Sequence, residues 1–119
     1  MGISSDFKDD ENVYRAILDI QLYDDGSVSM AALKDSRGLS VDRGYYRRDE
    51  VVIEDMKNRL EGRIAKLSVK DCKDAKTFLI YKPSAINKYH SEIHDSKHII
   101  EISPSKIRKL CKKIQLISV

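Results

Sequence analysis

Three side chains that can move protons or hold a metal recur at every second position in NKYHSEIHDSKH, residues 87–98. On an extended strand, His90, Glu92 and His94 would share one face, with alternate residues about 6.6 Å apart. Two imidazoles and a carboxylate can bind a transition metal, or supply an acid and a base for phosphodiester chemistry. The alternative is the solvated face of an antiparallel strand. We treat the three as candidate catalytic residues and predict no resident metal or cofactor.

A second candidate site is the segment SRGLSVDRGYYRR at residues 36–48. Its arginines can contact phosphates, and its tyrosines can stack on bases. Salt bridges to Asp42, Asp49 and Glu50 would neutralise part of this charge, so an ordinary charged loop is the alternative. The candidate phosphate or nucleic-acid contacts in this arginine segment are Arg37, Arg43, Tyr45, Tyr46, Arg47 and Arg48.

Two further features offer positive charge. Arg15 interrupts the apolar segment VYRAILDI at residues 13–20. Its side chain can reach the surface, which is usual for arginine, or anchor an anion from a buried position. A predicted helix over residues 104–113 carries five cations, which can follow a phosphate backbone or form an ordinary solvated face.

The charge of the chain is unevenly placed although its net value is only +3. Residues 1–36 hold three Lys or Arg against eight Asp or Glu, whereas residues 63–119 hold thirteen against five. An acidic N-terminal part and a basic C-terminal part favour a polyanion such as RNA or a nucleotide as partner. No apolar run is long enough to span a membrane, and the first residues lack the apolar core of a signal peptide. We therefore expect a cytoplasmic protein.

The elements that must position these residues follow from apolar periodicity and turn signals. A length of 119 residues predicts one domain, preceded by a flexible acidic N-terminus over residues 1–12. The pattern predicts a single α+β domain over 13–119, a mostly antiparallel mixed sheet with two packed helices. Helices are expected at about 49–61 and 104–113, and strands at 13–20, 63–70, 77–82 (an inner strand), 88–94 and 98–102, with residues 35–48 a loop that is extended only at 39–41.

Four fragments together resemble a group of short bacterial proteins with no assigned activity. They are YRAI (14–17), ALKDSRGLSVDR (32–43), YKP (81–83) and YHSEIH (89–94). The resemblance covers about half of the chain. It implies a bacterial or phage source and a single domain, and it names no substrate.

A second resemblance concerns three single residues. An arginine in an early strand, a serine in a mid-chain strand and a glutamate in a late strand resemble the layout of ADP-ribosyltransferases. The matching residues here are Arg15, Ser40 and Glu92. The sequence around them lacks the motifs usual in that family, and the chain is short for its fold.

Three hypotheses of function follow. The first is a nucleic-acid or nucleotide-phosphate binding protein that uses the arginine segment and the basic C-terminal helix. The second is a small toxin- or defence-type enzyme acting on RNA or a nucleotide, either ribonuclease-like or ADP-ribosyltransferase-like, with His90, Glu92, His94 and Arg15 in its site. The third is an accessory subunit that acts through a protein partner and has no activity alone. The second requires Arg15, Arg43 and His90 to meet in one cleft.

Overall fold

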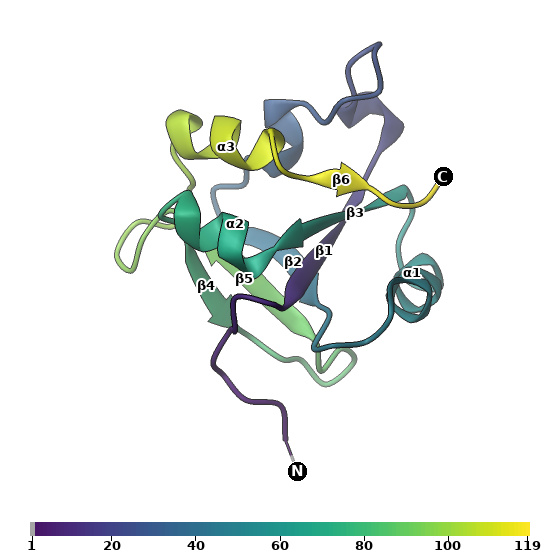
Figure 1. The fold of residues 1–119 in the computed structure, drawn as a ribbon, viewed down its shortest axis with the longest axis vertical. Helices are drawn as coiled ribbons and strands as arrows, with labels where there is room; N and C mark the ends of the chain where they lie inside the picture. The colour runs from purple at the N-terminus through teal and green to yellow at the C-terminus, as the bar shows by residue number, and fades with distance from the viewer. Residues whose placement is uncertain (1) are drawn as a thin grey trace.

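The backbone forms one six-stranded sheet in which every neighbouring pair of strands is antiparallel (Figure 1). The computed structural model describes residues 2–119. This architecture confirms the predicted single α+β domain. The strands are β1 (Asn12–Ile17), β2 (Leu39–Arg43), β3 (Arg63–Ser68), β4 (Phe78–Tyr81), β5 (His90–His94) and β6 (Gln115–Leu116), in the spatial order β4-β5-β2-β1-β3-β6.

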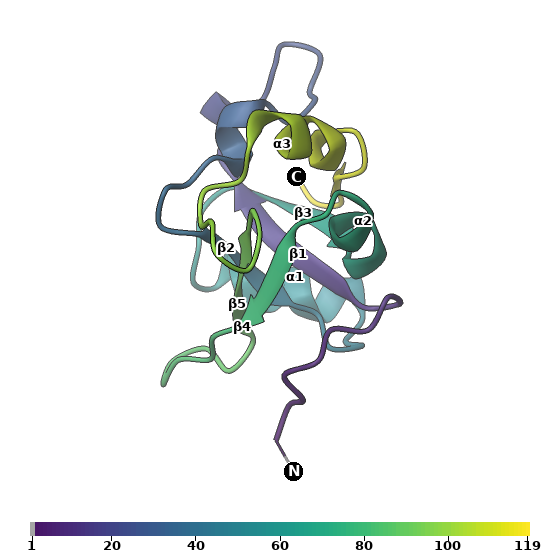
Figure 2. The same ribbon diagram turned by 90° about the vertical axis from the view of Figure 1, so that its left-hand side faces the viewer.

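Three α-helices and two 3-10 turns complete the fold. The helices are α1 (Asp49–Lys57), α2 (Val69–Asp74) and α3 (Pro104–Cys111), and the 3-10 turns are η1 (Asp19–Gln21) and η2 (Met30–Leu33). In Figures 1 and 2, α1 lies apart from α2 and α3, across the sheet. Between residues 2 and 119, no helix combines the length and the apolar character needed to cross a bilayer.

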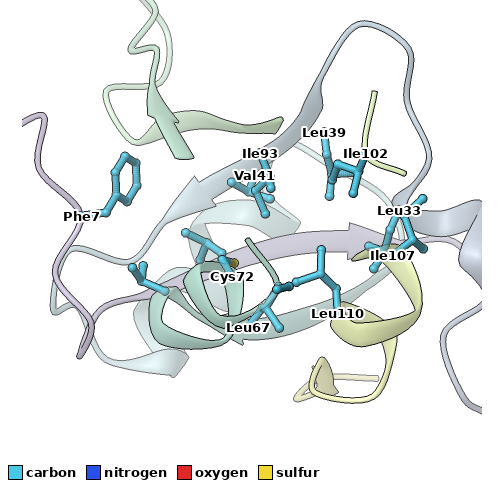
Figure 3. Close-up of a cluster of buried hydrophobic side chains, with 13 residues drawn as sticks. Phe7, Leu33, Leu39, Val41, Leu67, Cys72, Ile93, Ile102, Ile107 and Leu110 are labelled. Atoms are coloured by element: carbon cyan, nitrogen blue, oxygen red, sulfur yellow. The ribbon is translucent and has the colours of Figure 1, made fainter. Parts of the chain in front are cut away.

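Side-chain alternation along β1 divides the core between the two faces of the sheet. Val13 is buried with side chains of α2 and α3, whereas the next residue, Tyr14, is buried with Val52 and Met56 of α1. Successive residues of a strand point to opposite faces, so this one step assigns each helix to a face. Figure 3 shows the larger cluster, in which Ile107 and Leu110 of α3 pack beside strand residues that include Leu67, Val41 and Ile93.

Several predicted elements differ from the structure. Residues 69–74 form α2 instead of the end of a strand and a turn, because the Ser68 hydroxyl accepts a hydrogen bond from the Asp71 N–H at 3.0 Å and begins a helix. Residues 98–102 form no strand. There the Asp95 N–H donates to the Ile100 carbonyl, which closes a tight loop. The predicted inner strand at 77–82 is β4, which lies at an edge of the sheet.

The differences that matter most for the site concern β2 and the end of α1. Residues 39–43, expected to be mostly loop, form β2 in the middle of the sheet between β5 and β1. The predicted helices at 49–61 and 104–113 end earlier, at Lys57 and Cys111. The shorter α1 leaves residues 59–61 in an irregular segment beside the sheet.

Candidate functional site

A cleft of about 610 Å³ lies on the α1 side of the sheet, beside β1 and β2. Its wall combines apolar side chains with several polar groups. The segment before β5 closes one side through Asn87 and His90. The lining residues are Tyr14, Arg15, Ala16, Leu18, Ser40, Val41, Asp42, Met56, Arg59, Leu60, Glu61, Asn87 and His90.

Arg15 occupies the place where β1 and β2 separate. The ladder between these strands contains only two residue pairs, ending at Tyr14 opposite Asp42. Beyond it, Arg15 Nε donates to the Ala32 carbonyl at 3.0 Å, and Nη1 donates to the Ser40 carbonyl at 2.8 Å. Burial lowers the pKa of the Arg15 guanidinium, with a smaller opposing effect from Asp35. An arginine nevertheless stays charged at neutral pH.

One nitrogen of Arg15 is left for a ligand. Nη2 makes no hydrogen bond with any residue from 2 to 119, whereas Nε and Nη1 are both bonded. In the same part of the chain, no buried side-chain nitrogen lacks a partner, so this nitrogen is accessible to solvent. Arg15 is one of the residues that line the cleft, although alternation places its side chain on the same face of β1 as Val13, opposite to Tyr14.

His90 lies on the same wall of the cleft. Its Nδ1 is 2.9 Å from the Lys82 carbonyl oxygen, and its Nε2 is 3.4 Å from the Ser40 hydroxyl. Ser40 is itself exposed on β2. The carbonyl therefore orients the imidazole so that Nε2 points to an exposed hydroxyl at the cleft wall.

Glu92 is the most buried of the three candidate catalytic residues in HSEIH, with 8% of its surface exposed. Its Oε1 lies 2.8 Å from His94 Nε2, and its Oε2 lies 3.4 Å from Lys82 Nζ. Burial alone would raise the pKa of Glu92, but the hydrogen bonds from His94 and Lys82 outweigh burial and hold the pKa below its ordinary value. Glu92 is thus an ionised carboxylate fixed at both oxygens.

Gly38 allows the backbone to pass directly over this carboxylate. Its φ of +102° is in the region that favours glycine, and a Cβ there would lie 2.5 Å from Glu92 Oε1. Any other residue would collide with Glu92 or with His94. The glycine is therefore part of the frame that holds Glu92.

Arg15, Ser40 and Glu92 lie on the three neighbouring strands β1, β2 and β5. Ser40 and Glu92 are direct cross-strand partners of β2 and β5, and Arg15 of β1 is bonded to the Ser40 carbonyl. His90 sits on the same face of β5 as Glu92. On this face of β5, His90 lines the cleft, whereas Glu92 is buried beneath Gly38 and is not one of the lining residues.

Arg43 does not join this cleft, which corrects the expectation that it contacts phosphate. The meeting of Arg15, Arg43 and His90 in one cleft, which the enzyme hypothesis required, is therefore not formed. Its guanidinium is fully buried and forms an ion pair with buried Glu11 at 2.9 Å. It also donates to the carbonyls of Ser4 and Asp6, and it stacks 4.1 Å from the centre of the Phe7 ring. Arg43 is therefore committed to binding the chain's own N-terminal segment.

The same contacts concern the predicted flexible N-terminus. Phe7 belongs to the core cluster in Figure 3, and Glu11 is 1% exposed. Residue 12 is the first residue of β1. Residues 4–11 are thus packed against the domain, and Met1 lies outside the described residues.

The rest of the arginine segment is divided between structural and exposed residues. Arg47 donates to the Gly44 and Arg43 carbonyls and lies 3.4 Å above the Tyr89 ring. This arrangement corrects its assignment as a free phosphate contact, because the guanidinium is already bound. Arg37 and Arg48 are exposed, and the rings of Tyr45 and Tyr46 lie 5.9 Å apart at a tilt of 51°, with the Tyr46 hydroxyl donating to Asp10.

The basic helix lies on the other side of the sheet. Ile107 and Leu110 of α3 pack into the cluster opposite the α1 face, so the exposed cations of this helix point away from the cleft. Lys106 is bound to Asp95, while Arg108, Lys109, Lys112 and Lys113 are exposed. The basic helix and the cleft are therefore on opposite faces of the sheet.

Sequence reasoning missed Asp42, Arg59 and Asn87 in the cleft wall. Buried Asp42 accepts hydrogen bonds from Arg59 Nη2 and from Asn87 Nδ2, the latter at 3.0 Å. Alternation along β2 could have placed Asp42 beside Ser40, two residues earlier on the same face. No local signal links it to Arg59 or Asn87. Within residues 2–119, no group of three or more His, Cys, Asp or Glu is arranged to hold a metal ion.

Comparisons with protein-family models, with curated proteins and with solved structures gave no match to this chain.

Proposed function

We propose that this protein is a small ADP-ribosyltransferase-like enzyme that binds NAD in the cleft beside β1, β2 and β5. The observation that carries the proposal is the meeting of Arg15, Ser40 and Glu92 on three adjacent strands. These are the three positions that resemble the layout of that family in the sequence.

The cleft has properties that suit a nucleotide. Its volume of about 610 Å³ falls within the range of small-molecule sites. The free Nη2 of Arg15 can donate to a phosphate oxygen. The apolar side chains of Leu18, Met56 and Leu60 offer a surface for a flat ring. A cation beside an apolar wall is what a dinucleotide needs from its site.

The ionised state of Glu92 supports the proposed transfer. ADP-ribosyl transfer breaks the glycosidic bond between the ribose C1′ and the nicotinamide nitrogen, and positive charge develops on the sugar. A carboxylate stabilises such an oxocarbenium-like transition state and can accept a hydrogen bond from a ribose hydroxyl. His94 and Lys82 hold Glu92 ionised and oriented.

The geometry gives less support to a ribonuclease-like enzyme. Such an enzyme would use His90 and His94 as an acid and base pair across the scissile phosphate. His94 directs its Nε2 to Glu92, and only His90 lines the cleft. The predicted cytoplasmic location is consistent with an enzyme that consumes NAD.

The test is release of nicotinamide from NAD by the purified protein, followed by chromatography. We expect slow release by the wild type and a loss of about 100-fold or more in Glu92→Gln, because a transition-state contact is removed. Glu101→Gln, at an exposed position, is the matched control and should keep the wild-type rate. Arg15→Lys should weaken NAD binding about tenfold, the effect of losing one hydrogen bond to a charged group.

Binding is measured separately by two-dimensional NMR titration with NAD. Shifts should appear at Arg15, Ser40 and His90. If NAD produces no shift in the cleft and no nicotinamide is released, the proposal is wrong, and a partner protein or RNA becomes the first alternative.

A further inference from the structure

The two histidines that flank Glu92 carry their ring protons on different nitrogens, His90 on Nδ1 and His94 on Nε2. A carbonyl oxygen can only accept a hydrogen bond, so His90 Nδ1, at 2.9 Å from the Lys82 carbonyl, must carry a proton. In the neutral ring, Nε2 of His90 then has a free lone pair. His94 Nε2 faces the ionised Glu92 carboxylate at 2.8 Å and must itself be the donor. The neutral His94 ring then has its lone pair on Nδ1, and His90 is the one of the two histidines that lines the cleft.

The lone pair of His90 is available at the cleft. Its nearest partner, the Ser40 hydroxyl, is 3.4 Å from Nε2, which is long for a hydrogen bond. A substrate hydroxyl can therefore replace this contact at little cost. His90 forms no ion pair with any residue from 2 to 119. The charged groups in its surroundings are Arg15 on β1, Asp42 on β2, Arg59 and Glu61 after α1, and Lys82 before β5.

We infer that His90 is the general base that takes the proton of a hydroxyl acceptor, which is water or an alcohol. This inference rests on the proposed function. In the step, the acceptor oxygen forms a bond to the ribose C1′ while the bond from C1′ to the nicotinamide nitrogen breaks. The bonding electron pair goes to the nicotinamide ring, which leaves neutral. The acceptor proton goes to His90 Nε2 and then to solvent.

The chemistry of the acceptor follows from the state of this nitrogen. A hydroxyl group must lose a proton as it forms the new bond, so a positioned base accelerates its attack. A carboxylate acceptor arrives ionised and has no proton to give. A base fixed by the Lys82 carbonyl at the wall of the cleft therefore favours hydroxyl acceptors.

The experiment measures NAD hydrolysis by water and transfer to added methanol as a function of pH. In the wild type, both rates should rise with pH, because a general base acts only in its unprotonated form. His90→Gln should bind NAD as tightly as the wild type within about threefold, yet react about 100-fold more slowly. The rate of His90→Gln should also no longer rise with pH as the wild-type rate does. His98→Gln, at an exposed position, should match the wild type.

Chemical rescue separates a catalytic role from a folding defect. Free imidazole in the buffer should restore part of the activity of His90→Ala and should leave the wild-type rate unchanged. If His90→Gln keeps the wild-type rate and pH profile, the inference is overturned while the proposed function stands. If the wild type neither binds nor consumes NAD, the proposed function itself is wrong.

Discussion

Arg15 and Arg43 are both strand arginines, and they end in opposite roles. Arg43 uses Nε and both terminal nitrogens on Glu11, Ser4 and Asp6, and its guanidinium is fully buried. Arg15 uses two nitrogens on backbone carbonyls and keeps the third open to a cleft. An arginine is available to a ligand only when the fold leaves at least one nitrogen of its guanidinium group without a partner. The contacts of Arg43 therefore serve the stability of the fold, whereas Arg15 keeps one nitrogen without a partner.

The largest expected effect is on the buried pair. Glu11→Gln leaves the Arg43 charge without its counter-ion and should lower the free energy of unfolding by about 3–5 kcal/mol. Urea unfolding followed by circular dichroism measures this change. Arg37→Ala, at a side chain that is 91% exposed, is the control and should stay within about 0.5 kcal/mol of the wild type. Equal stability of both variants would contradict the structural role of Arg43.

Gly38 gives the sharpest test of the cleft frame. Gly38→Ala places a Cβ 2.5 Å from Glu92 Oε1 and should cost about 1–3 kcal/mol more than Gly26→Ala. Gly26 has a φ of +85° and no atom within 4 Å of its Cβ position, so it controls for backbone strain alone. Unfolding in urea compares the two variants. Nicotinamide release should fall in Gly38→Ala and persist in Gly26→Ala.

Acid should affect stability through Glu92. Its pKa is lowered from 4.5 in the folded protein, so its contribution to stability is present above the ordinary pKa and is lost as the pH falls through the folded pKa. The wild type should therefore lose more stability than Glu92→Gln between about pH 5 and pH 3. Thermal melts across this range measure the difference. Parallel curves would mean that His94 and Lys82 do not stabilise the carboxylate.

The smallest effect concerns the helix across the sheet. Lys109 of α3 and Lys112 and Lys113, which follow it, are exposed. Each substitution by Ala should lower the salt dependence of binding to a short single-stranded RNA by about one unit of slope. Fluorescence anisotropy at several salt concentrations measures this slope. The triple variant should bind NAD as the wild type does, because α3 lies on the opposite face from the cleft. Weakened NAD binding would connect the two surfaces.

Alternation and turn signals predicted most of the strands and the closing helix. Ser103 and Pro104 begin α3 as expected, and β3 and β5 follow their alternating patterns. The same reasoning failed for β2, whose residues read as a loop, because a short strand with polar residues forms only between partners distant in the sequence. It also placed β4 wrongly, as an inner strand. Apolar residues on both faces do not show whether a strand is central or at an edge.

By itself, the sequence determined that His90, Glu92 and His94 share a face, and that Arg15 lies within a strand. It also singled out Ser40 through the resemblance. Only the tertiary structure decided that Arg15 faces a cleft while Arg43 is buried, and that Glu92 is ionised beneath Gly38. The physical reason is that the backbone of a strand turns successive side chains to opposite faces, which the local sequence already shows. Burial and hydrogen-bond partners depend instead on contacts between distant segments. Glu11 and Arg43 are 32 residues apart, and no local pattern connects them.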